Sequence, residues 1–385
     1  MLGVAMASVF QRDYAVIPPC IVKGDGVFLY DNTGRRYLDA MGSAGVVGIG
    51  HGRTEVAQAL ADAGQSVTFV YGGAFSHPWQ EKLAASLLSV APAGMGSVYF
   101  VSGGSEANET AIKLARQYHV ERGEPQRYKF IARWQSYHGV TLATLSLSGR
   151  TSWRSLYSPY LLPVNHIAPP YEYRCVYCAR HGGCTLACAD ELERAILLEG
   201  PETVAAFFAE TIVGTTVSGL TPHKDYYPRV REICDKYGVL FIADEVLSGY
   251  GRTGQPFAIQ EWDALPDMIT AGKAIASGYA PLGAVLISAA ITEFFRSGKK
   301  RFNHGFTYSG HPGSCFIGQK VFDIMQREDL FKRPGVIGKY LFERLGELQQ
   351  RFRSIGQVRG RGLYAGIEFV ADRSSRAPFA SETRR

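Results

Sequence analysis

The feature that most constrains the fold of this chain is a series of short, continuously apolar runs separated by helical or loop-forming sequence. The runs cover residues 130–132, 204–209, 239–243, 268–270 and 282–287. Strands that are apolar on both sides are expected in a sheet whose two faces are covered by helices. The pattern therefore predicts an α/β fold with a doubly wound sheet.

A strand-to-helix junction precedes these runs. Residues 97–101 are rich in β-forming residues and end at the sequence Ser-Gly-Gly-Ser, residues 102–105, after which a helical pattern covers 106–122. Glycine lets a backbone approach a ligand closely, and a helix N-terminus offers free N–H groups and the positive end of its dipole. The junction is a candidate phosphate site, and the alternative is an ordinary helix cap.

Segments near both ends predict a second, smaller unit. Residues 25–39 form a predicted β-hairpin. Near the C-terminus the sequence predicts one helix and two strands, at 336–352, 355–358 and 363–369.

We divide the chain accordingly into three parts. Residues 1–60 are the N-terminal part of a small domain, residues 61–320 are a large domain, and residues 321–385 are the C-terminal part of the small domain.

Two residues after apolar strands can carry chemistry. Asp244 follows the run 239–243, and a buried carboxylate requires a partner, which would be a helix cap, Arg252 or the ring nitrogen of a heteroaromatic cofactor. Lys273 lies between small residues, with no other lysine between Lys236 and Lys299. Desolvation there would lower its pKa and favour the neutral amine that a Schiff base needs, whereas the ordinary alternative is a solvated surface lysine.

An aromatic residue adds to this set. Tyr137, in the sequence Ser-Tyr-His-Gly at 136–139, would stack on a planar ring or pack as a core tyrosine. In chain order the sequence presents a phosphate loop, an aromatic residue, a strand-end aspartate, and a lysine 29 residues (273 − 244) after that aspartate. This layout resembles that of fold-type-I enzymes that use pyridoxal 5′-phosphate (PLP).

The sequence resembles the class III (ω-type) aminotransferases from residue 26 to about residue 370. The motifs that carry the resemblance are FVSGGSEANETAIKLAR (100–116), SYHG (136–139), ADEVLSGYGRTG (243–254), ITAGKAIASGYAPLGAV (269–285), TYSGHP (307–312) and RGRGLYAGIE (359–368). The resemblance implies a large PLP-binding domain with a mainly parallel, seven-stranded sheet, and a smaller α+β domain built from both termini.

The resemblance also implies roles for individual residues. Lys273 would form the Schiff base with PLP, and Asp244 would pair with the pyridinium nitrogen. Further cofactor-binding residues would be Gly103, Gly104, Ser105, Tyr137, His138, Glu210 and Val246. Thr307 would reach the phosphate of the neighbouring subunit, which implies a homodimer, and Arg359 would bind the substrate carboxylate.

The implied reaction is transamination between an amino donor (an ω-amino acid, an amine or an amino acid) and a keto acid. Two alternatives remain open. The first is another PLP reaction on the same scaffold, such as racemisation, decarboxylation, aminomutase transfer or elimination. The second is a non-catalytic homologue, because family members usually continue for several tens of residues beyond the point that corresponds to Arg385, so the small domain is expected to be truncated.

A cysteine cluster lies outside these motifs. Cys175, Cys178, Cys184 and Cys188 have a spacing that resembles a tetrahedral zinc site, although the intervening loop is short. Free thiols in a loop are the preferred interpretation, with the metal site as the alternative.

Charge and hydropathy restrict the remaining possibilities. The net charge of +6 is modest, and no run of five basic residues occurs, so nucleic-acid binding is not expected. No apolar stretch has the length of a membrane span, and the N-terminus lacks the pattern of a signal peptide. We expect a cytoplasmic enzyme that acts on small molecules.

Overall fold

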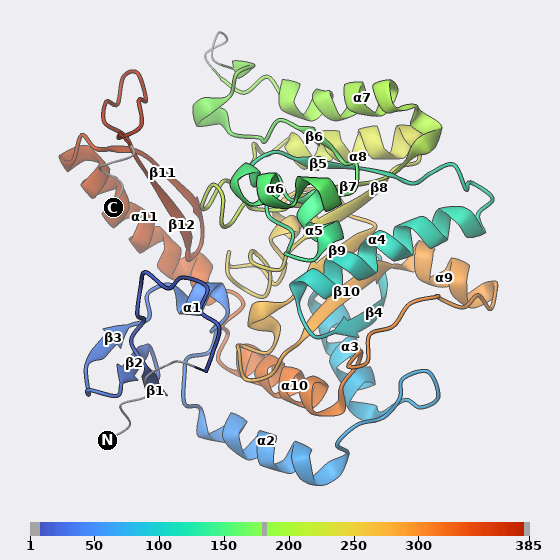
Figure 1. The fold of residues 1–385 in the computed structure, drawn as a ribbon, viewed down its shortest axis with the longest axis horizontal. Coiled ribbons are helices and arrows are strands. Elements are labelled where there is room, and N and C mark those ends of the chain that lie inside the picture. Colours follow the sequence, from blue (N-terminus) through green and yellow to red (C-terminus); the bar gives the residue numbers. More distant parts are fainter. Residues whose placement is uncertain (1–7, 179–182, 381–385) are drawn as a thin grey trace.

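The computed structural model describes residues 8–178 and 183–380, and its central feature is a seven-stranded sheet (Figure 1). The strands lie side by side in the order β4 (Met95–Val101), β10 (Gly283–Ser288), β9 (Met268–Ala271), β8 (Leu240–Asp244), β7 (Val204–Glu210), β5 (Lys129–Arg133) and β6 (Asn165–Ile167). β10 runs antiparallel to both of its neighbours, and the other pairs are parallel. The predicted seven-stranded α/β architecture is thereby confirmed.

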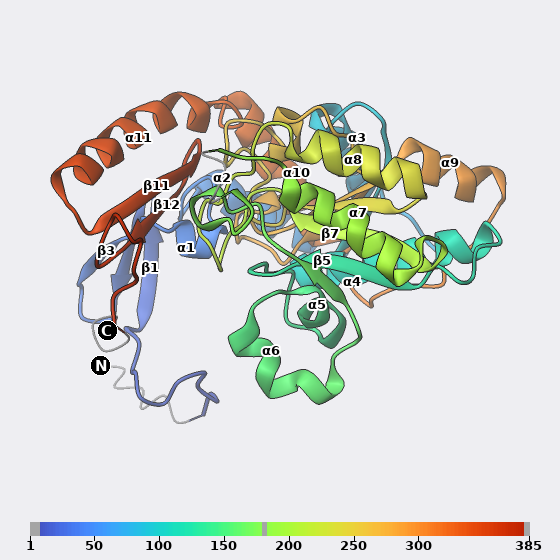
Figure 2. The same cartoon turned by 90° about the horizontal axis from the view of Figure 1, so that it is seen from above.

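Helices cover both faces of this sheet, as the apolar strands require. Successive residues of a strand point to opposite faces. Phe207 and Phe241 pack into one hydrophobic core, whereas Phe208 and Ile242 pack into a second core on the other face. Figure 2 shows α7 and α8 on one face of the sheet and α4 and α5 on the other.

One or two α-helices separate most successive strands of the sheet, but only 3-10 turns lie between β8, β9 and β10. The helices around the sheet are α2 (Thr54–Ser66), α3 (Pro78–Val90), α4 (Gly104–Glu121), α5 (Leu142–Leu147), α6 (Thr151–Tyr157), α7 (Ala187–Glu199), α8 (Tyr226–Tyr237), α9 (Ala289–Ser297) and α10 (Pro312–Arg327). Within the described ranges, no helix is both long enough and apolar enough to cross a membrane.

The two ends of the chain form smaller sheets on one side of the molecule. The first sheet contains β1 (Ile21–Asp25), β2 (Phe28–Asp31) and β3 (Arg36–Leu38), and the short turn α1 (Gly42–Gly45) follows it. The second is the hairpin of β11 (Ile355–Arg361) and β12 (Tyr364–Phe369), against which α11 (Arg333–Arg351) packs. Figures 1 and 2 place both sheets beside the same end of the large sheet.

Two details differ from what the sequence pattern suggested. The strand β6 was not expected, because its three residues include the polar Asn165 and His166 and form no apolar run. The predicted domain boundary after residue 320 falls inside α10, which packs against α2 and α3. The three-part division therefore stays a prediction.

Candidate active site

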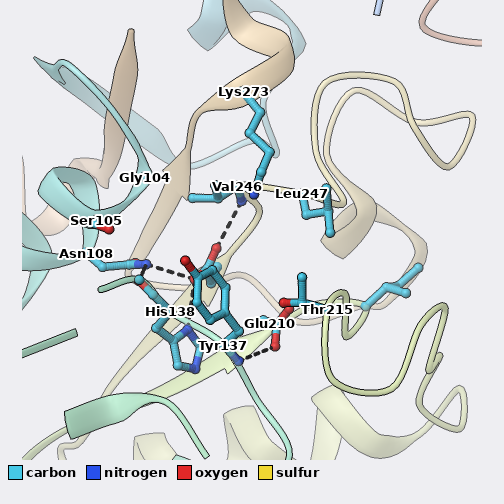
Figure 3. Close-up of a pocket in the computed structure, with 13 residues that line it drawn as sticks. Gly104, Ser105, Asn108, Tyr137, His138, Glu210, Thr215, Val246, Leu247 and Lys273 are labelled. Atoms are coloured by element: carbon cyan, nitrogen blue, oxygen red, sulfur yellow. Dashed lines mark hydrogen bonds and ion pairs between the residues drawn. The ribbon is translucent and has the colours of Figure 1, made fainter. Parts of the chain in front are cut away.

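A cavity of about 160 Å³ lies at the carboxyl ends of the parallel strands, which is where ligands of open α/β sheets bind. Its walls come from the start of α4, the segment after β5, the ends of β7 and β8, and the turn after β9 (Figure 3). The residues that line it are Gly104, Ser105, Asn108, Tyr137, His138, Gly139, Glu210, Ile212, Thr215, Asp244, Val246, Leu247 and Lys273.

Asp244, the last residue of β8, holds a buried carboxylate in this cavity. Its Oδ2 accepts a hydrogen bond from Asn108 Nδ2 and pairs with His138 Nδ1, both at 2.8 Å, and its Oδ1 accepts from the Val246 N–H at 3.0 Å (Figure 3). Burial alone would raise the pKa of Asp244, but the hydrogen bond and charge of His138, together with the other donors, hold it below its ordinary value. The carboxylate therefore stays ionised although it is buried.

Glu210 ends β7 directly beside Asp244 in the strand register. Its Oε1 accepts from the backbone N–H of Tyr137 at 2.8 Å, and its Oε2 accepts from that of Gly214 at 2.9 Å. Burial raises the pKa of Glu210, and the charge of Asp244 adds to this effect. Two neighbouring carboxyl groups thus have pKa values that move in opposite directions, which is a common property of catalytic sites.

Lys273 enters the cavity from the turn that follows β9. Its backbone φ is +47°, a left-handed conformation that is uncommon for any residue other than glycine. Burial lowers the pKa of the Lys273 amine, and the positive charge of Arg252 lowers it further, while the charges of Asp244 and Glu210 oppose both effects. The site therefore favours a neutral amine next to an ionised aspartate.

The close contact between the start of α4 and the side chain of Val246 explains why residue 104 is a glycine. A Cβ atom on Gly104 would lie 2.6 Å from Val246 Cγ1, so only glycine lets the helix begin against this valine. Ser105 follows at the helix N-terminus, and its Oγ accepts from the Val140 N–H at 3.2 Å. The 18-residue α4 directs free N–H groups and its positive dipole end at the cavity.

Three of the predicted site residues do not line the cavity. Gly103 is the N-cap of α4 and lies just outside it. Thr307 lies in a separate, larger groove, together with Tyr71 and Phe100. Arg359 lies on β11, where its guanidinium donates to Glu368 Oε2 at 2.6 Å.

The predicted cysteine cluster is brought together by the fold. Cys175, Cys178 and Cys188 are buried, Cys184 is half-buried, and all four are free thiols. Cys175 and Cys184 lie near enough to the Cys178 thiol to influence its pKa. In the described part of the chain, however, no group of three or more His, Cys, Asp or Glu side chains is arranged to hold a metal ion, so the zinc alternative gains no support.

The sequence motifs contained Asn108 without indicating its role. It lies on the buried, mainly apolar face of α4 that includes Ala107 and Ala111, and a polar residue on such a face is a signal that a buried partner exists. The partner is Asp244. Leu247, Ile212 and Thr215 also line the cavity, but no sequence pattern distinguishes them.

These residues fit a phosphorylated pyridine cofactor. Asp244 supplies an ionised carboxylate for a pyridinium N–H, the start of α4 supplies donors for a phosphate, and Lys273 supplies an amine for an aldehyde. Within the described structure, His138 Nε2 and Asn108 Oδ1 are buried and lack a protein partner, so the site contains further polar atoms for a ligand or water.

Comparisons with known proteins agree with this geometry. The family described as aminotransferase class III matches residues 9–384. A putrescine–pyruvate aminotransferase of Pseudomonas aeruginosa is 37% identical, over 94% of this chain and 79% of the relative. Among solved structures, an (S)-enantioselective ω-transaminase of Thermomicrobium roseum has a TM-score of 0.89 at 39% identity, covering 95% of this chain and 81% of the other. The ω-transaminase of Pseudomonas jessenii, solved in complex with PMP, has a TM-score of 0.87 at 33% identity, with 94% and 81% covered.

Proposed function

Because the chain belongs to the class III aminotransferases, we propose that the cavity around Lys273 and Asp244 is its catalytic site. The chain is a PLP-dependent transaminase that moves an amino group from an amine or amino acid to a keto acid. The predictions of cofactor and reaction are thereby confirmed. One observation carries the assignment of the site: a half-buried lysine in a left-handed conformation shares a cavity with a buried, ionised aspartate.

When bound, PLP supplies an aldehyde carbon that takes up the amino group and a conjugated ring that delocalises the electron pair left when the substrate carbon loses its proton. We assign two tasks to Lys273. Its Nζ would hold the cofactor through the aldehyde carbon, and it would also accept and return the proton of the substrate carbon. Both tasks need a neutral amine, which burial favours.

Asp244 is proposed to hold the proton on the ring nitrogen. A buried carboxylate can do this only if it stays ionised, and the low pKa that results from His138 and Asn108 satisfies this condition. His138 and Asn108 are therefore positioning residues, because they act on the cofactor through Asp244.

The remaining lining residues are proposed to orient the ring and the phosphate. Gly104 and Ser105 offer the N-terminus of α4 to the phosphate. Tyr137 and Val246 come from different segments of the cavity wall and are assigned to opposite faces of the ring. Glu210 is held by two backbone N–H groups close to the strand ends and is assigned to the side of the ring that carries the hydroxyl group.

A homodimer is part of the proposal. Thr307 lies in a groove that is separate from the cavity of its own subunit, and the groove is also lined by Tyr71, Gly72 and Phe100. A residue in that position is available to a second subunit, so we assign Thr307 to the cofactor phosphate of the partner. Exposed aromatic residues beside the groove, including Tyr71 and Tyr308, support an interface there.

The first experiment tests the assignment of Lys273. Reduction of the PLP-loaded protein with borohydride, followed by peptide mass spectrometry, should find the cofactor on the peptide that contains Lys273. We expect Lys273→Ala to lose this adduct and at least about 10³-fold in transfer from putrescine to pyruvate, because the positioned base and the attachment point are lost together. The matched variant Lys236→Ala, in an exposed lysine that pairs with Glu193, should keep both.

An adduct on another lysine, or turnover by Lys273→Ala close to that of the unchanged protein, would contradict the assignment. A reduced adduct on Lys273 without any transfer of the amino group would instead show that the site binds the cofactor but performs a different reaction.

A further inference from the structure

Four cysteines gather between β6 and the start of α7, outside the catalytic cavity. They are Cys175, Cys178, Cys184 and Cys188, and all four are free thiols. Burial raises the pKa of the Cys188 thiol to about 12, and the charges of the other three thiols add to this effect, so the four side chains are neighbours. Because no such group among the described residues is arranged to hold a metal ion, we consider the chemistry of the thiols themselves.

Cys178 is the thiol of this cluster whose surroundings favour the ionised form. Burial alone would raise the pKa of Cys178, but the backbone N–H and hydroxyl of Thr185, together with two neighbouring thiols, hold it below its ordinary value. The pKa values of the other three thiols are raised, mainly because these groups are buried. The cluster therefore combines one stabilised thiolate, which is the reactive form of cysteine, with neutral thiols beside it.

Cys184 is placed to be the partner of this thiolate. The hydroxyl oxygen of Thr185, the next residue, lies 3.9 Å from Cys178 Sγ, so the chain at residues 184 and 185 passes beside Cys178. Cys184 is half-buried, whereas Cys175 and Cys188 are buried, so it gives solvent the best access to the cluster. Cysteines that are sensitive to oxidation combine a stabilised thiolate, access from solvent and a second cysteine nearby.

The cysteine segment is attached to the C-terminal hairpin. Arg174, which directly precedes Cys175, donates from Nε to Glu368 Oε1 on β12 at 2.5 Å. The hydroxyl of Tyr171 donates to the other oxygen of the same carboxylate. A movement of the chain at Cys175 would therefore disturb two contacts of one carboxylate.

The same segment packs against a wall of the catalytic cavity. Tyr171 forms a small hydrophobic cluster with apolar side chains of the loop 213–220, which follows β7. In this loop the Gly214 N–H holds Glu210 Oε2 at 2.9 Å, and Thr215 lines the cavity. The cysteine segment and the cavity thus share the loop 213–220 as a common neighbour.

We propose that Cys178 and Cys184 form a peroxide-sensitive dithiol, and that their disulfide loosens the loop 213–220. The Cys178 thiolate attacks one oxygen of hydrogen peroxide and the O–O bond breaks. The leaving hydroxide becomes water with the proton that Cys178 had lost to solvent. The Cys184 sulfur then attacks the sulfenic acid on Cys178, so that an S–S bond forms and the S–O bond breaks. The second hydroxide leaves as water with the Cys184 proton, and the two thiols together have lost the two electrons that reduce the peroxide.

Formation of this bond must move the chain. The two sulfur atoms of a disulfide lie about 2 Å apart, which is much closer than two free thiols can approach. The contact of Cys178 with Thr185 is consequently altered. Tyr171 and Arg174 belong to the same short stretch of chain as Cys175 and Cys178, so their contacts with the hairpin and the loop weaken as well.

Peptide mapping of the unchanged full-length protein tests the disulfide directly. The protein is treated with a few equivalents of hydrogen peroxide, its remaining thiols are alkylated, and it is digested with trypsin. Trypsin separates Cys178, in the peptide 175–180, from Cys184, in the peptide 181–194. We expect these two peptides to be linked, with fragmentation placing the bond between Cys178 and Cys184. Cys178→Ser and Cys184→Ser should lose the link, whereas Cys20→Ser, at an exposed cysteine outside the cluster, should keep it.

Hydrogen exchange tests the effect on the cavity wall. In the oxidised protein, amides of the loop 213–220 should exchange at least about threefold faster than in the reduced protein, because the contacts that hold the loop are weakened. Dithiothreitol should restore the slower exchange. Cys184→Ser treated with peroxide in the same way should show no such change, and the comparison of oxidised with reduced unchanged protein needs no variant.

Three results would overturn the inference. A disulfide within either of the two tryptic peptides, or a sulfinic acid on Cys178 without a link, would show that the pairing is wrong. Zinc in the purified protein that is released by peroxide would show that the thiols bind a metal instead. A Cys178–Cys184 disulfide that leaves the exchange of the loop unchanged would show that oxidation does not reach the cavity.

These measurements do not depend on turnover. Failure of the proposed catalytic site would be seen separately, as the absence of a reduced adduct on Lys273.

Discussion

Lys273 adopts a backbone conformation that a lysine rarely has, with φ of +47°. Such a conformation costs on the order of 1–2 kcal/mol, and it persists only where the surrounding structure enforces it. Here Gly272 precedes the lysine in a close contact, because a Cβ atom on it would lie 3.3 Å from the Gly104 N atom. This backbone conformation directs the Lys273 amine into the cavity. It lies there with the carboxyl groups of Glu210 and Asp244, whose pKa values are shifted in opposite directions.

The carboxyl group of Glu245, the residue directly after Asp244, has a different role. Glu245 is fully buried, and it accepts from the Ile259 N–H and from the Ser248 hydroxyl. Burial raises its pKa to about 7, although these donors oppose the shift. Because this pKa is raised from 4.5, the folded protein keeps a proton that the unfolded chain has lost between pH 4.5 and about 7. Its contribution to stability is therefore fully present below pH 4.5 and is lost as the pH rises to about 7.

We predict that Glu245→Gln removes this pH dependence. The free energy of unfolding of the unchanged protein, relative to that of the variant, should fall by about 3 kcal/mol as the pH rises through this window. Urea titrations at several pH values measure the difference. Glu232→Gln, on the exposed side of α8, is the control. Its free energy of unfolding should depend on pH in the same way as that of the unchanged protein. A difference that is constant with pH would show that the carboxyl group is ionised in the fold throughout the window.

At the scale of elements, the start of α4 connects the sheet to the cavity. The strand β4 ends at Val101, and the chain enters the helix through two glycines with different surroundings. Gly104 is packed against Val246, whereas a Cβ atom on Gly103 would meet nothing within 4 Å. The two neighbouring glycines therefore provide an internal comparison.

We predict that Gly104→Ala destabilises the protein by about 1–3 kcal/mol, because the new methyl group overlaps Val246 Cγ1 and either the helix or the valine must move. It should also weaken PLP binding, since both residues line the cavity. Gly103→Ala should change stability by no more than about 0.5 kcal/mol, because its φ of −178° suits any residue. Thermal unfolding and cofactor titration measure both effects. Equal effects of the two substitutions would show that the loss arises from the backbone entropy of glycine and not from the contact.

At the scale of the whole molecule, segments from both ends of the chain converge on the cavity. The N-terminal turn α1 contacts Arg252 and Leu247, and the C-terminal hairpin contacts Gly214 and Thr253. Arg252 is therefore positioned by the Gly45 carbonyl and the Leu363 N–H, which belong to opposite ends of the chain. The proposed contact of Thr307 with the cofactor phosphate of a partner subunit would extend the same principle to a dimer.

We predict that cofactor binding and dimer formation are coupled. If Thr307 completes the phosphate site of the partner, PLP must favour the dimer and the dimer must favour PLP by the same factor. The concentration at which half of the dimer dissociates should fall at least about tenfold when PLP is added, as measured by analytical ultracentrifugation. Thr307→Ala should reduce this shift, whereas Thr221→Ala, whose hydroxyl bonds locally to the Gly219 carbonyl, should not. A dimer dissociation constant that does not change when PLP is added would show that Thr307 does not contribute to the phosphate site of the partner subunit.

The sequence by itself determined the α/β class, the positions of the main strands and the location of Asp244 and Lys273 at strand ends. These depend on local pattern: a strand buried on both faces is apolar throughout, and a polar residue directly after it must lie at the sheet edge. The hairpin 25–39 and the long C-terminal helix were predicted for the same reason, since turn residues and helical periodicity are properties of short segments.

Only the tertiary structure decided which polar groups are paired. The sequence implied that Arg359 binds the substrate carboxylate, but the register of β11 and β12 brings Glu368 against its guanidinium. It named Arg252 only as an alternative partner of Asp244 and gave no role to Tyr364, whereas the folded chain directs the Arg252 guanidinium to the Gly45 carbonyl and leaves the Tyr364 hydroxyl without a partner among the described residues. The local sequence pattern determines whether a residue is buried. The partner of a buried polar group usually comes from a distant segment of the chain, so a short stretch of sequence does not contain both the group and its partner.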